Sequence, residues 1–546
     1  MFRFRELGAG LWVYMLLIAL IAVVAILGSS RSGNESKNKM QAAELTLSSM
    51  AADEGEADSA TLTPSFTPTS GQSAQGQVVG PDEFPSGYNP LTGQPLCIPE
   101  AVDWAVVGIS ISQFPPGPTR PPTGLSWAAW VTEWWIGQGE TRLYAMFYGC
   151  YPELAPLKAQ GLGGELPQLN EGQYVISDSA WYDANGNSMQ DEGEPGLPNV
   201  TVTLFLGSEE VASTMTDAGG KYFLIFEPQF RVSYRLQFKL PGSLTENYSV
   251  VQPNEGEENV DSDADPNSGY TDFFTLPEDQ NSISNLDIGV RQSLRVSGIR
   301  SGRIVFETWR KFFEACTIIE GADPVVKEHL VQCASATVAD PHDIGSAGVD
   351  IARLKSIAEQ SVGRYGPPNL TGNMFDPNAP PGGTSAQTLN MFYNINNQTQ
   401  WQFASEMGAY KRYQNTYLAP DVLEVSMDRI TDEPLGFENI ILLFVPHVQL
   451  NHEGTIFDAN FGFNTGEAKL FRDGKVYDIF WSTVNGLYEK ETGRLRPIRF
   501  VDAQGNPFPL KPGSLWIHVM HTASEFWEPD PGSGIWRARW YSPTFQ

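Results

Sequence analysis

The sequence has few basic residues, few cysteines and none of the short motifs that mark common enzyme families. Its 546 residues include 35 Lys and Arg against 64 Asp and Glu, which gives a formal net charge of -29 at pH 7. So acidic a chain repels phosphate backbones, and this argues against a nucleic-acid partner. The same balance is typical of a soluble exterior that tolerates cations.

Cysteine is rare, and the cysteines present form no metal or redox motif. The four residues permit three pairings, and none has the C-x-x-C spacing of a metal or redox site. Disulfides outside the cytosol are one interpretation, and reduced, buried thiols are the other. The cysteines are Cys97, Cys150, Cys316 and Cys333.

Enzyme signatures are also missing. The chain contains no G-x-S-x-G nucleophile motif, no Walker loop, no dinucleotide fingerprint and no H-E-x-x-H zinc motif. Its six histidines fall at no recognisable metal spacing, and a structural or surface role is expected for each. The sequence therefore favours a non-catalytic function. The histidines are His329, His342, His447, His452, His518 and His521.

One long hydrophobic run lies near the N-terminus. Residues 8–28 contain no charged side chain and are long enough to cross a bilayer as a helix. A cleaved signal peptide is the alternative, but the run exceeds the usual length of its apolar region. We expect residues 1–28 to form a transmembrane signal anchor with its N-terminus inside. Residues 29–85, rich in Ser, Thr, Gly, Ala, Glu and Pro, are expected to form a disordered stalk.

An acidic twelve-residue stretch in the middle of the chain has the spacing of a calcium loop. Oxygen-bearing side chains occupy loop positions 1, 3, 5, 9 and 12, and position 7 offers a backbone carbonyl. A hard cation such as Ca²⁺ takes about six to eight oxygen ligands, so this spacing predicts a calcium site. Position 6 is Ser188, where the EF-hand pattern has Gly, and an acidic surface turn is the alternative. The predicted ligands are Asp183, Asn185, Asn187, Met189, Asp191 and Glu194.

Strands rather than a second helix follow this loop, which excludes a pair of EF-hands. Residues 200–205 alternate apolar and polar side chains, and residues 217–222 form a tight turn into another strand. The recognisable segments of this region are 180–187, 193–200, 216–222, 261–266 and 286–290. Through these segments, residues 173–290 resemble the B-type repeat of Sdr adhesins, a calcium-binding relative of the Cna B-type sandwich.

The resemblance implies an antiparallel sandwich stabilised by calcium. Asp261, Asp263 and Asp265 are candidates for a second cation site, with a solvated acidic turn as the alternative. Calcium loops of this kind work where the ion is plentiful, so calcium would place this part of the chain outside the cytosol.

Five short motifs lie outside this region: N-P-L-T-G at 89–93, R-P-P-T-G-L at 120–125, G-E-T-R at 139–142, S-G-I-R-S-G-R at 297–303 and F-R-D-G-K at 471–475. Through these motifs, residues 86–153 and 296–546 resemble the YerB-like lipoprotein family, a domain of unknown function from bacterial envelopes. Because they lie on both sides of the sandwich, we expect the sandwich to be an insertion whose flanks meet in space. The expected host domains are an N-terminal domain of 86–153 and 296–383, and a C-terminal domain of 384–546.

Five residues in or near these host motifs are candidates for a ligand-binding site. Guanidinium groups gathered beside one carboxylate would suit an anion such as a carboxylate or phosphate. The alternative is that the carboxylate pairs with one arginine and the other arginines bind carbonyls or water. Members of the family carry histidines where this chain has Ile319 and Pro368, so chemistry that depends on them is not expected. The candidates are Arg120, Glu133, Arg142, Arg300 and Arg303.

The sequence thus predicts an α+β two-domain host with an inserted all-β antiparallel sandwich and an N-terminal transmembrane helix. The favoured function is an extracytoplasmic binding or scaffold protein of the cell envelope, held in the cell membrane by a single span. Calcium is the expected cofactor, and an envelope polymer or another anionic ligand is the expected partner. An enzyme acting on envelope polymers and an adhesin-like surface protein are the alternatives.

Overall fold

The computed structural model describes residues 77–542, apart from short gaps at 116–118, 138–139, 159, 162, 243, 246, 258, 344, 364–365, 417–418 and 452–455. All of the described residues belong to one compact unit. No helix within the described ranges is long and apolar enough to cross a membrane. The transmembrane helix predicted at 8–28 and most of the predicted stalk lie outside the described residues.

The fold is mainly β, and the predicted α+β class is wrong. Strands make up most of the regular structure, whereas the longest α-helix in the described part of the chain, α6 (Ile351–Gln360), has 10 residues. The physical reason is that most apolar residues alternate with polar ones or run in short blocks, which are strand patterns. The other α-helices of this part are α4 (Val305–Phe313), α5 (Pro324–Lys327) and α7 (Leu487–Thr492).

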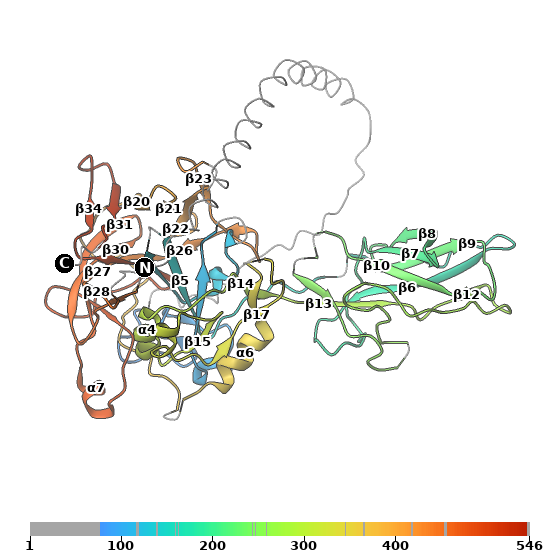
Figure 1. Cartoon of the computed structure of the whole chain (residues 1–546), viewed down its shortest axis with the longest axis horizontal. Helices are drawn as coiled ribbons and strands as arrows, with labels where there is room; N and C mark the ends of the chain where they lie inside the picture. Colours follow the sequence, from blue (N-terminus) through green and yellow to red (C-terminus); the bar gives the residue numbers. More distant parts are fainter. Residues whose placement is uncertain are drawn as a thin grey trace, which may run out of the picture. The chain divides into compact units, whose positions relative to one another are not determined.

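Residues 174–292 form two sheets of their own, drawn in shades of green in Figure 1. Their strands are β6 (Tyr174–Tyr182), β7 (Thr201–Leu206), β8 (Glu209–Met215), β9 (Lys221–Phe226), β10 (Tyr234–Lys239), β11 (Tyr248–Val250), β12 (Ser282–Ile283) and β13 (Ile288–Gln292). One sheet has the order β10-β7-β8, and the other has β11-β13-β6-β12 with β9 beside β6. Alternation in β7, β9 and β10 buries every second side chain, which is the pattern of a sandwich. The pairing is not purely antiparallel, since β6 runs parallel to β12 and β13.

An eleven-stranded sheet joins the parts of the host. Its strands are β3 (Val107–Ser112), β4 (Trp130–Gly137), β5 (Glu140–Phe147), β15 (Cys316–Ile319), β16 (Ala334–Ser335), β19 (Thr384–Ser385), β27 (Asn439–Val445), β30 (Thr465–Arg472), β31 (Lys475–Ser482), β32 (Arg499–Val501) and β33 (Leu515–His521). β15, which follows the sandwich in sequence, pairs with β3, which precedes it. β4 pairs in parallel with β33 near the C-terminus. The segments that flank the sandwich therefore meet in one sheet, which also continues across the boundary expected at 383–384.

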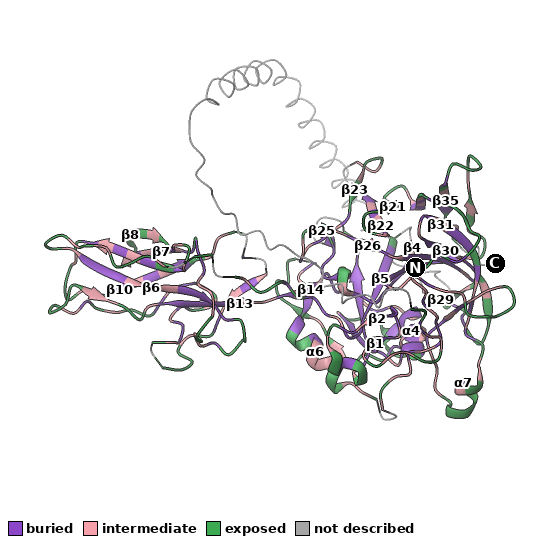
Figure 2. Ribbon diagram, turned by 180° about the vertical axis from the view of Figure 1, so that it is seen from behind, coloured by how far each residue is buried: buried purple, intermediate pink, exposed green. Residues whose placement is uncertain are grey.

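A seven-stranded sheet packs against one face of this large sheet, and α4 covers part of the other face. Trp401 and Trp516, from the two sheets, lie with ring centroids 5.2 Å apart. On the opposite face, Tyr144 stacks on Phe306 of α4 at 4.7 Å. Figure 2 shows the central strands β4 and β5 of the large sheet as largely buried. The seven strands are β20 (Thr388–Asn394), β21 (Asn397–Ala404), β22 (Ala409–Asn415), β23 (Leu423–Val425), β26 (Gly436–Phe437), β34 (Glu525–Trp527) and β35 (Ile535–Arg539).

The four cysteines form two disulfides, which answers the pairing that the sequence left open. Cys97 bonds to Cys150, and Cys316 bonds to Cys333. The first bond ties the segment before β3 to the segment after β5. The second ties β15 to the segment that leads into β16. Each disulfide therefore closes a loop of the host around the eleven-stranded sheet.

Candidate functional site

Glu133 is the one carboxylate of the predicted ligand site, and it is completely buried. It lies in β4, whose residues 130–135 are all buried. A buried carboxylate needs several hydrogen-bond donors to replace its lost water. Its Oε1 accepts from Gln113 Nε2 at 3.0 Å and from Thr141 Oγ1 at 2.7 Å, and its Oε2 accepts from Trp516 Nε1 at 3.1 Å. Glu133 is therefore held by donors from the eleven-stranded sheet and from the segment after β3.

Gln113 connects this carboxylate to the seven-stranded sheet. Its Oε1 accepts from Arg412 Nη2 at 2.8 Å and from Gln414 Nε2 at 3.0 Å, and both donors lie in β22. Arg412 is itself buried, and its Nη1 donates to Gln414 Oε1 and to Ser426 Oγ, each at 2.9 Å. The polar network of Glu133 thus spans the interface between the two host sheets.

His518 of β33 lies beside Glu133 in the register of the two parallel strands. Trp401 Nε1 donates to His518 Nε2 at 3.0 Å, so Nε2 accepts and Nδ1 carries the ring proton. Nδ1 lies 3.3 Å from Glu133 Oε2 and 3.2 Å from the Tyr393 hydroxyl. Burial lowers the pKa of His518 to about 4; Glu133 opposes this shift and Arg412 adds to it. The imidazole is therefore neutral at pH 7.

Glu133 is ionised in this network. Burial alone would raise its pKa, but His518, Arg412 and the hydrogen bonds from Thr141 and Gln113 outweigh burial and hold the pKa below its ordinary value. Burial lowers the pKa of Arg412 to about 10, although Glu133 acts in the other direction, so the guanidinium is charged at pH 7. One buried carboxylate and one buried guanidinium therefore balance each other. Such a network makes the contact between two sheets specific and rigid.

The structure separates the five predicted ligand-site residues into two groups. Arg120 joins the Glu133 network, because its Nε donates to the Gln113 carbonyl at 2.9 Å and its Nη1 donates to the Asn415 carbonyl at 3.0 Å. Burial, together with the nearby charge of Arg412, lowers the pKa of Arg120 to about 9. The second group, away from this network, consists of Arg142, Arg300 and Arg303.

Sequence reasoning missed most of the network that surrounds Glu133. Its members come from separate segments without a shared motif, so no local signal points to them. His518 had one signal, since it alternates with Trp516 along β33 and both side chains therefore share a face. Because β33 pairs with β4, the side chains of Trp516 and His518 lie beside the Glu133 carboxylate. The members that were missed are Gln113, Thr141, Trp401, Arg412, Gln414 and Trp516.

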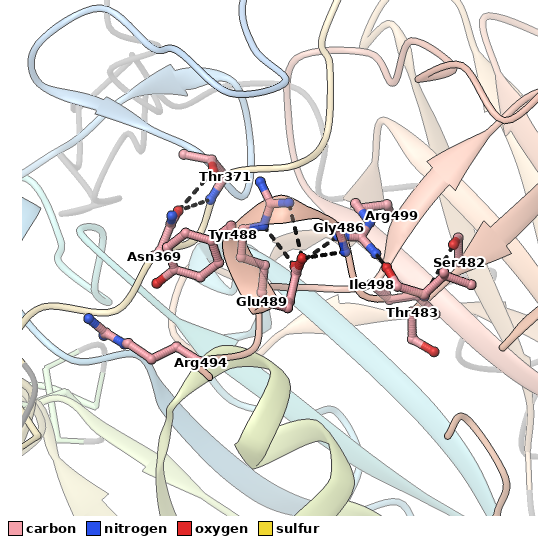
Figure 3. Close-up of polar contacts among 12 residues, drawn as sticks. Asn369, Thr371, Ser482, Thr483, Gly486, Tyr488, Glu489, Arg494, Ile498 and Arg499 are labelled. Carbon is pink, nitrogen blue, oxygen red and sulfur yellow. Dashed lines mark hydrogen bonds and ion pairs between the residues drawn. The ribbon is translucent and has the colours of Figure 1, made fainter. Parts of the chain in front are cut away.

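Another charged network, drawn in Figure 3, is centred on Glu489 of α7. Its carboxylate accepts from the Gly486 N–H at 2.7 Å and from Arg496 Nε and Arg499 Nη1, each at 2.9 Å. Burial opposes ionisation, but the Arg496 bond, backbone donors and the Arg499 charge together lower the pKa of Glu489 to about 2. Because these charges are already paired, the network ties α7 to β32 and has a structural role.

The predicted calcium loop turns tightly around Asp183. The Asp183 carboxylate accepts from the backbone N–H groups of Gly186 at 2.6 Å, Asn187 at 3.2 Å and Ser188 at 2.9 Å. The Met189 N–H donates to Asn187 Oδ1 at 2.9 Å. Ser188 has φ of 65°, the left-handed conformation that favours Gly. The backbone therefore makes the turn for which the EF-hand pattern uses Gly at position 6.

The other predicted calcium ligands converge on Asp191. Asn185 Nδ2 and Asn187 Nδ2 donate to Asp191 Oδ2 at 2.6 and 2.8 Å. Glu194 turns back onto the loop, where it accepts from the Ala184 N–H at 2.8 Å and from the Asp191 N–H at 3.1 Å. No three His, Cys, Asp or Glu side chains gather as a metal centre in the described part of the chain. The oxygen-rich set here fits a hard cation only with the Asn side chains and a backbone carbonyl included.

The acidic segment beyond the loop brings several carboxylates together. Asp261 is buried, and its Oδ1 has no hydrogen-bond partner among the described residues. Asp263 Oδ2 accepts from the Asp287 N–H at 2.7 Å, and Trp181 Nε1 donates to Asp287 Oδ1 at 3.1 Å. Burial raises the pKa of Asp287 to about 8, against the Trp181 bond and with the help of neighbouring aspartates. Asp265 instead accepts hydrogen bonds within its own exposed turn.

Two family models match parts of the chain. Residues 174–290 match the SdrD B-like domain, and residues 389–517 match the C-terminal domain of DUF3048, a protein of unknown function. These matches confirm the resemblance to an Sdr B-type domain and to the YerB-like family. Among solved structures, the YerB protein from Bacillus subtilis is similar with a TM-score of 0.42 and 16% identity, over 79% of this chain and 96% of that chain.

Curated relatives match a domain-sized part of the chain. The bone sialoprotein-binding protein of Staphylococcus aureus (strain MRSA252) is 32% identical over 114 residues, which are 21% of this chain and 9% of that protein. Serine-aspartate repeat-containing protein D of Staphylococcus aureus (strain Newman) is 31% identical over 114 residues, 21% of this chain and 8% of that protein. Colossin-B of Dictyostelium discoideum is 28% identical over 172 residues, 29% of this chain and 4% of that protein. The chain spans less than a tenth of the length of each of these relatives.

Proposed function

Because the chain is a YerB-like protein that carries an SdrD B-like domain, we propose that it is a surface or scaffold protein of the cell envelope without catalytic activity. The observation that carries this proposal is the insertion itself. The segments on either side of the sandwich return to β3 and β15 of one sheet, so the host presents a whole second domain without interrupting its core. An inserted domain of this kind is suited to spacing or contact.

The enclosed state of Glu133 supports a role without catalysis. Glu133, His518 and Arg412 are the charged or titratable groups that would do acid–base work, and each is at most 1% exposed. A substrate would have to displace the packed interface between the two sheets to reach them. Their hydrogen bonds instead hold the two sheets together.

We place the protein outside the cytosol. The bonds Cys97–Cys150 and Cys316–Cys333 support this location, because structural disulfides persist in oxidising compartments and are rare in the cytosol. An envelope polymer is the partner class that fits a surface or scaffold protein at this location. Calcium is plentiful outside the cytosol, and a calcium site in the sandwich would suit this location.

We also propose that Ca²⁺ binds the loop of residues 183–194 and stiffens the sandwich. The left-handed backbone at Ser188 and the convergence of Asn185 and Asn187 on Asp191 support this proposal. The ion would neutralise the loop carboxylates and join both ends of the loop, which cross-links the end of β6 to the segment before β7. The residues that would hold it are Asp183, Asn185, Asn187, Asp191, Glu194 and, through its carbonyl, Met189.

A thermal unfolding experiment on the full chain tests the calcium site. Calcium at about 100 times its dissociation constant should add about 2.7 kcal/mol to the stability of the sandwich relative to a chelator. Magnesium at the same concentration should have a smaller effect, since it requires stricter octahedral geometry. Asp183→Ala should remove the calcium-dependent shift in melting temperature. Asp272→Ala, an exposed aspartate of the same insertion, should keep it.

The wild-type melt decides this part of the proposal. If the melting temperature is the same with calcium and with chelator, the loop does not bind the ion. If Asp183→Ala shifts with calcium as much as the wild type, the ion binds elsewhere.

Incubation with purified envelope polymers tests the absence of catalysis. We expect the polymers to be retained by the protein and to keep their chain length, as measured by co-sedimentation and by size analysis of the soluble fraction. Release of soluble fragments by the wild type, abolished in Glu133→Gln, would contradict the proposed scaffold role and support an enzyme.

A further inference from the structure

Arg142 lies on the face of the eleven-stranded sheet that α4 covers. It belongs to β5, where it alternates with Thr141 and Leu143 and shares a face with Tyr144. Tyr144 stacks on Phe306 of α4 at 4.7 Å, which identifies that face. Arg142 is therefore separated by the sheet from the network around Glu133.

Backbone pairing places Arg300 on the same face. Ile299 forms an antiparallel bridge to β3, and the Arg300 N–H donates to the Ser110 carbonyl at 2.9 Å. On the other side of β3, Ser112 is the register partner of Arg142. Two small serine side chains therefore lie between the arginines, which allows their guanidinium groups to approach each other across β3.

Arg303 completes a cluster of three positive charges. Its Nη1 donates to Ser301 Oγ at 2.9 Å and to the Gly302 carbonyl at 3.2 Å, so the side chain folds back along its own segment. Burial lowers the pKa of Arg142 to about 9, and Arg303 and Arg300 act in the same direction. The three guanidinium groups therefore lie close enough for their positive charges to repel one another. This repulsion costs free energy unless an anion offsets it.

Several buried donors in and beside this cluster lack acceptors. Arg142 is 6% exposed, and its Nε and Nη1 have no hydrogen-bond partner in the described part of the chain. The same holds for Arg300 Nε and for Trp134 Nε1, and Trp134 is the cross-strand partner of Arg142 in β4. A buried donor without a partner costs about 1–3 kcal/mol, so several on one face call for an acceptor group.

Nearby carboxylates do not fill this role. None of the three arginines forms an ion pair with another described residue. Glu140 and Glu320 act on Arg142, and Glu140 and Asp323 act on Arg303, through their charge and without an ion pair. The buried Arg472, in contrast, is paired with the Asp473 carboxylate and with the backbone carbonyls of Pro509 and Asp376. The contrast indicates that this cluster is built for a ligand that the chain does not supply.

We infer that Arg142, Arg300 and Arg303 bind an oxyanion of the phosphate class, with the indole N–H of Trp134 as a further donor. Guanidinium groups match phosphate oxygens in pairs, and a phosphate offers more acceptor oxygens and more charge than a carboxylate does. Three clustered positive charges favour the more highly charged anion. The cluster shares no residue with the calcium loop or the Glu133 network, so this inference stands or fails separately from the proposed function.

Calorimetric titration of the full chain at low ionic strength tests the inference. Inorganic phosphate should bind saturably, and glycerol 3-phosphate distinguishes a free ion from a phosphate carried on a larger molecule. Acetate should bind at least tenfold more weakly than phosphate. Arg300→Gln and Arg303→Gln should each weaken phosphate binding at least tenfold, whereas Arg353→Gln, an exposed arginine of α6, should leave it unchanged.

The titration also has outcomes that overturn the inference. They are the absence of saturable phosphate binding to the folded wild type, an affinity for acetate equal to that for phosphate, or an unchanged affinity in the Arg300→Gln, Arg303→Gln double variant. If circular dichroism shows that a Gln variant does not fold, Arg303→Lys replaces it. Lysine keeps the positive charge but cannot form the bidentate hydrogen bonds of a guanidinium group. Phosphate binding should therefore still weaken in a protein with the native circular dichroism spectrum.

Discussion

Trp401 donates its indole N–H to Nε2 of His518 at 3.0 Å, and this bond determines which nitrogen of the ring carries the proton. Nδ1 then carries the proton and lies 3.2 Å from the Tyr393 hydroxyl and 3.3 Å from Glu133 Oε2. Trp401 lies in β21 and His518 in β33, so the donor and the acceptor come from different sheets. The protonation of the buried network therefore depends on how the two host sheets pack.

Removing the buried carboxylate should destabilise the host strongly. Glu133→Ala leaves the Arg412 guanidinium buried without its counter-charge, which should cost about 3–5 kcal/mol in the free energy of unfolding. Urea denaturation followed by tryptophan fluorescence measures this loss. Glu406→Ala, which removes an exposed carboxylate near β21, should change stability by no more than about 0.5 kcal/mol. Equal effects of the two substitutions would show that Glu133 does not stabilise the sheet interface.

The sandwich should lose stability as pH rises when calcium is absent. Asp287 has a folded-state pKa of about 8 against an ordinary 3.8, so the folded state holds the proton more tightly than the unfolded state. This contribution is complete below pH 3.8 and is lost as pH rises through 8, with a slope of up to about 1.4 kcal/mol per pH unit. Denaturation curves in chelator between pH 5 and pH 8 measure it.

Asp287→Asn should flatten this pH dependence, because the amide does not titrate. Asp272→Asn, which changes an exposed aspartate of the same insertion, should keep the wild-type slope. A wild-type slope in Asp287→Asn would assign the pH dependence to another group.

The two disulfides should contribute unequally to stability. Loop-closure entropy gives about 4 kcal/mol for the bond between Cys97 and Cys150, which are 53 residues apart, and about 3 kcal/mol for the bond between Cys316 and Cys333, which are 17 apart. Paired Cys→Ser variants compared by guanidinium denaturation measure both losses. A larger loss from the shorter loop would mean that contacts made by the cysteines outweigh chain entropy.

Gly196 should not tolerate a side chain. A Cβ at this position would lie 1.9 Å from the Gly219 carbonyl oxygen, so Gly196→Ala forces two backbone segments of the sandwich apart. We expect a loss of at least about 1–3 kcal/mol, measured as a lower melting temperature and faster proteolysis of the insertion. At Gly242 nothing lies within 4 Å of the added atom, and Gly242→Ala should melt like the wild type.

The inserted domain could be predicted from the sequence because each of its motifs consists of residues close together in the chain. The segment 193–200 contains Gly196, and the segment 216–222 contains Gly219, and the two glycines meet where the chain segments cross. Such turn residues are required by local backbone geometry, which a short motif records. Ser188 departed from the EF-hand pattern, but its φ of 65° shows that the same backbone turn forms without Gly.

The fold class of the host could not be predicted from the sequence in the same way. Helical periodicity does mark α4 and α6, but those helices are short and only flank two large sheets. The balance between helix and strand therefore depended on segments whose pattern is weak in isolation. Their strand structure is completed by hydrogen bonds to distant neighbours.

By itself, the sequence determined that a sandwich of the Sdr B type interrupts a YerB-like host and that acidic oxygens are spaced for a cation, since these features depend on residues close together in the chain. Only the tertiary structure decided which charged groups meet. Glu133 and Trp516 are 383 residues apart and touch because β4 is the neighbour of β33, while Arg142 is turned to the opposite face by the two-residue period of β5. Strand order and sheet packing are global properties of the chain. No local pattern could therefore show that Arg142 and Glu133 lie on opposite faces of the sheet.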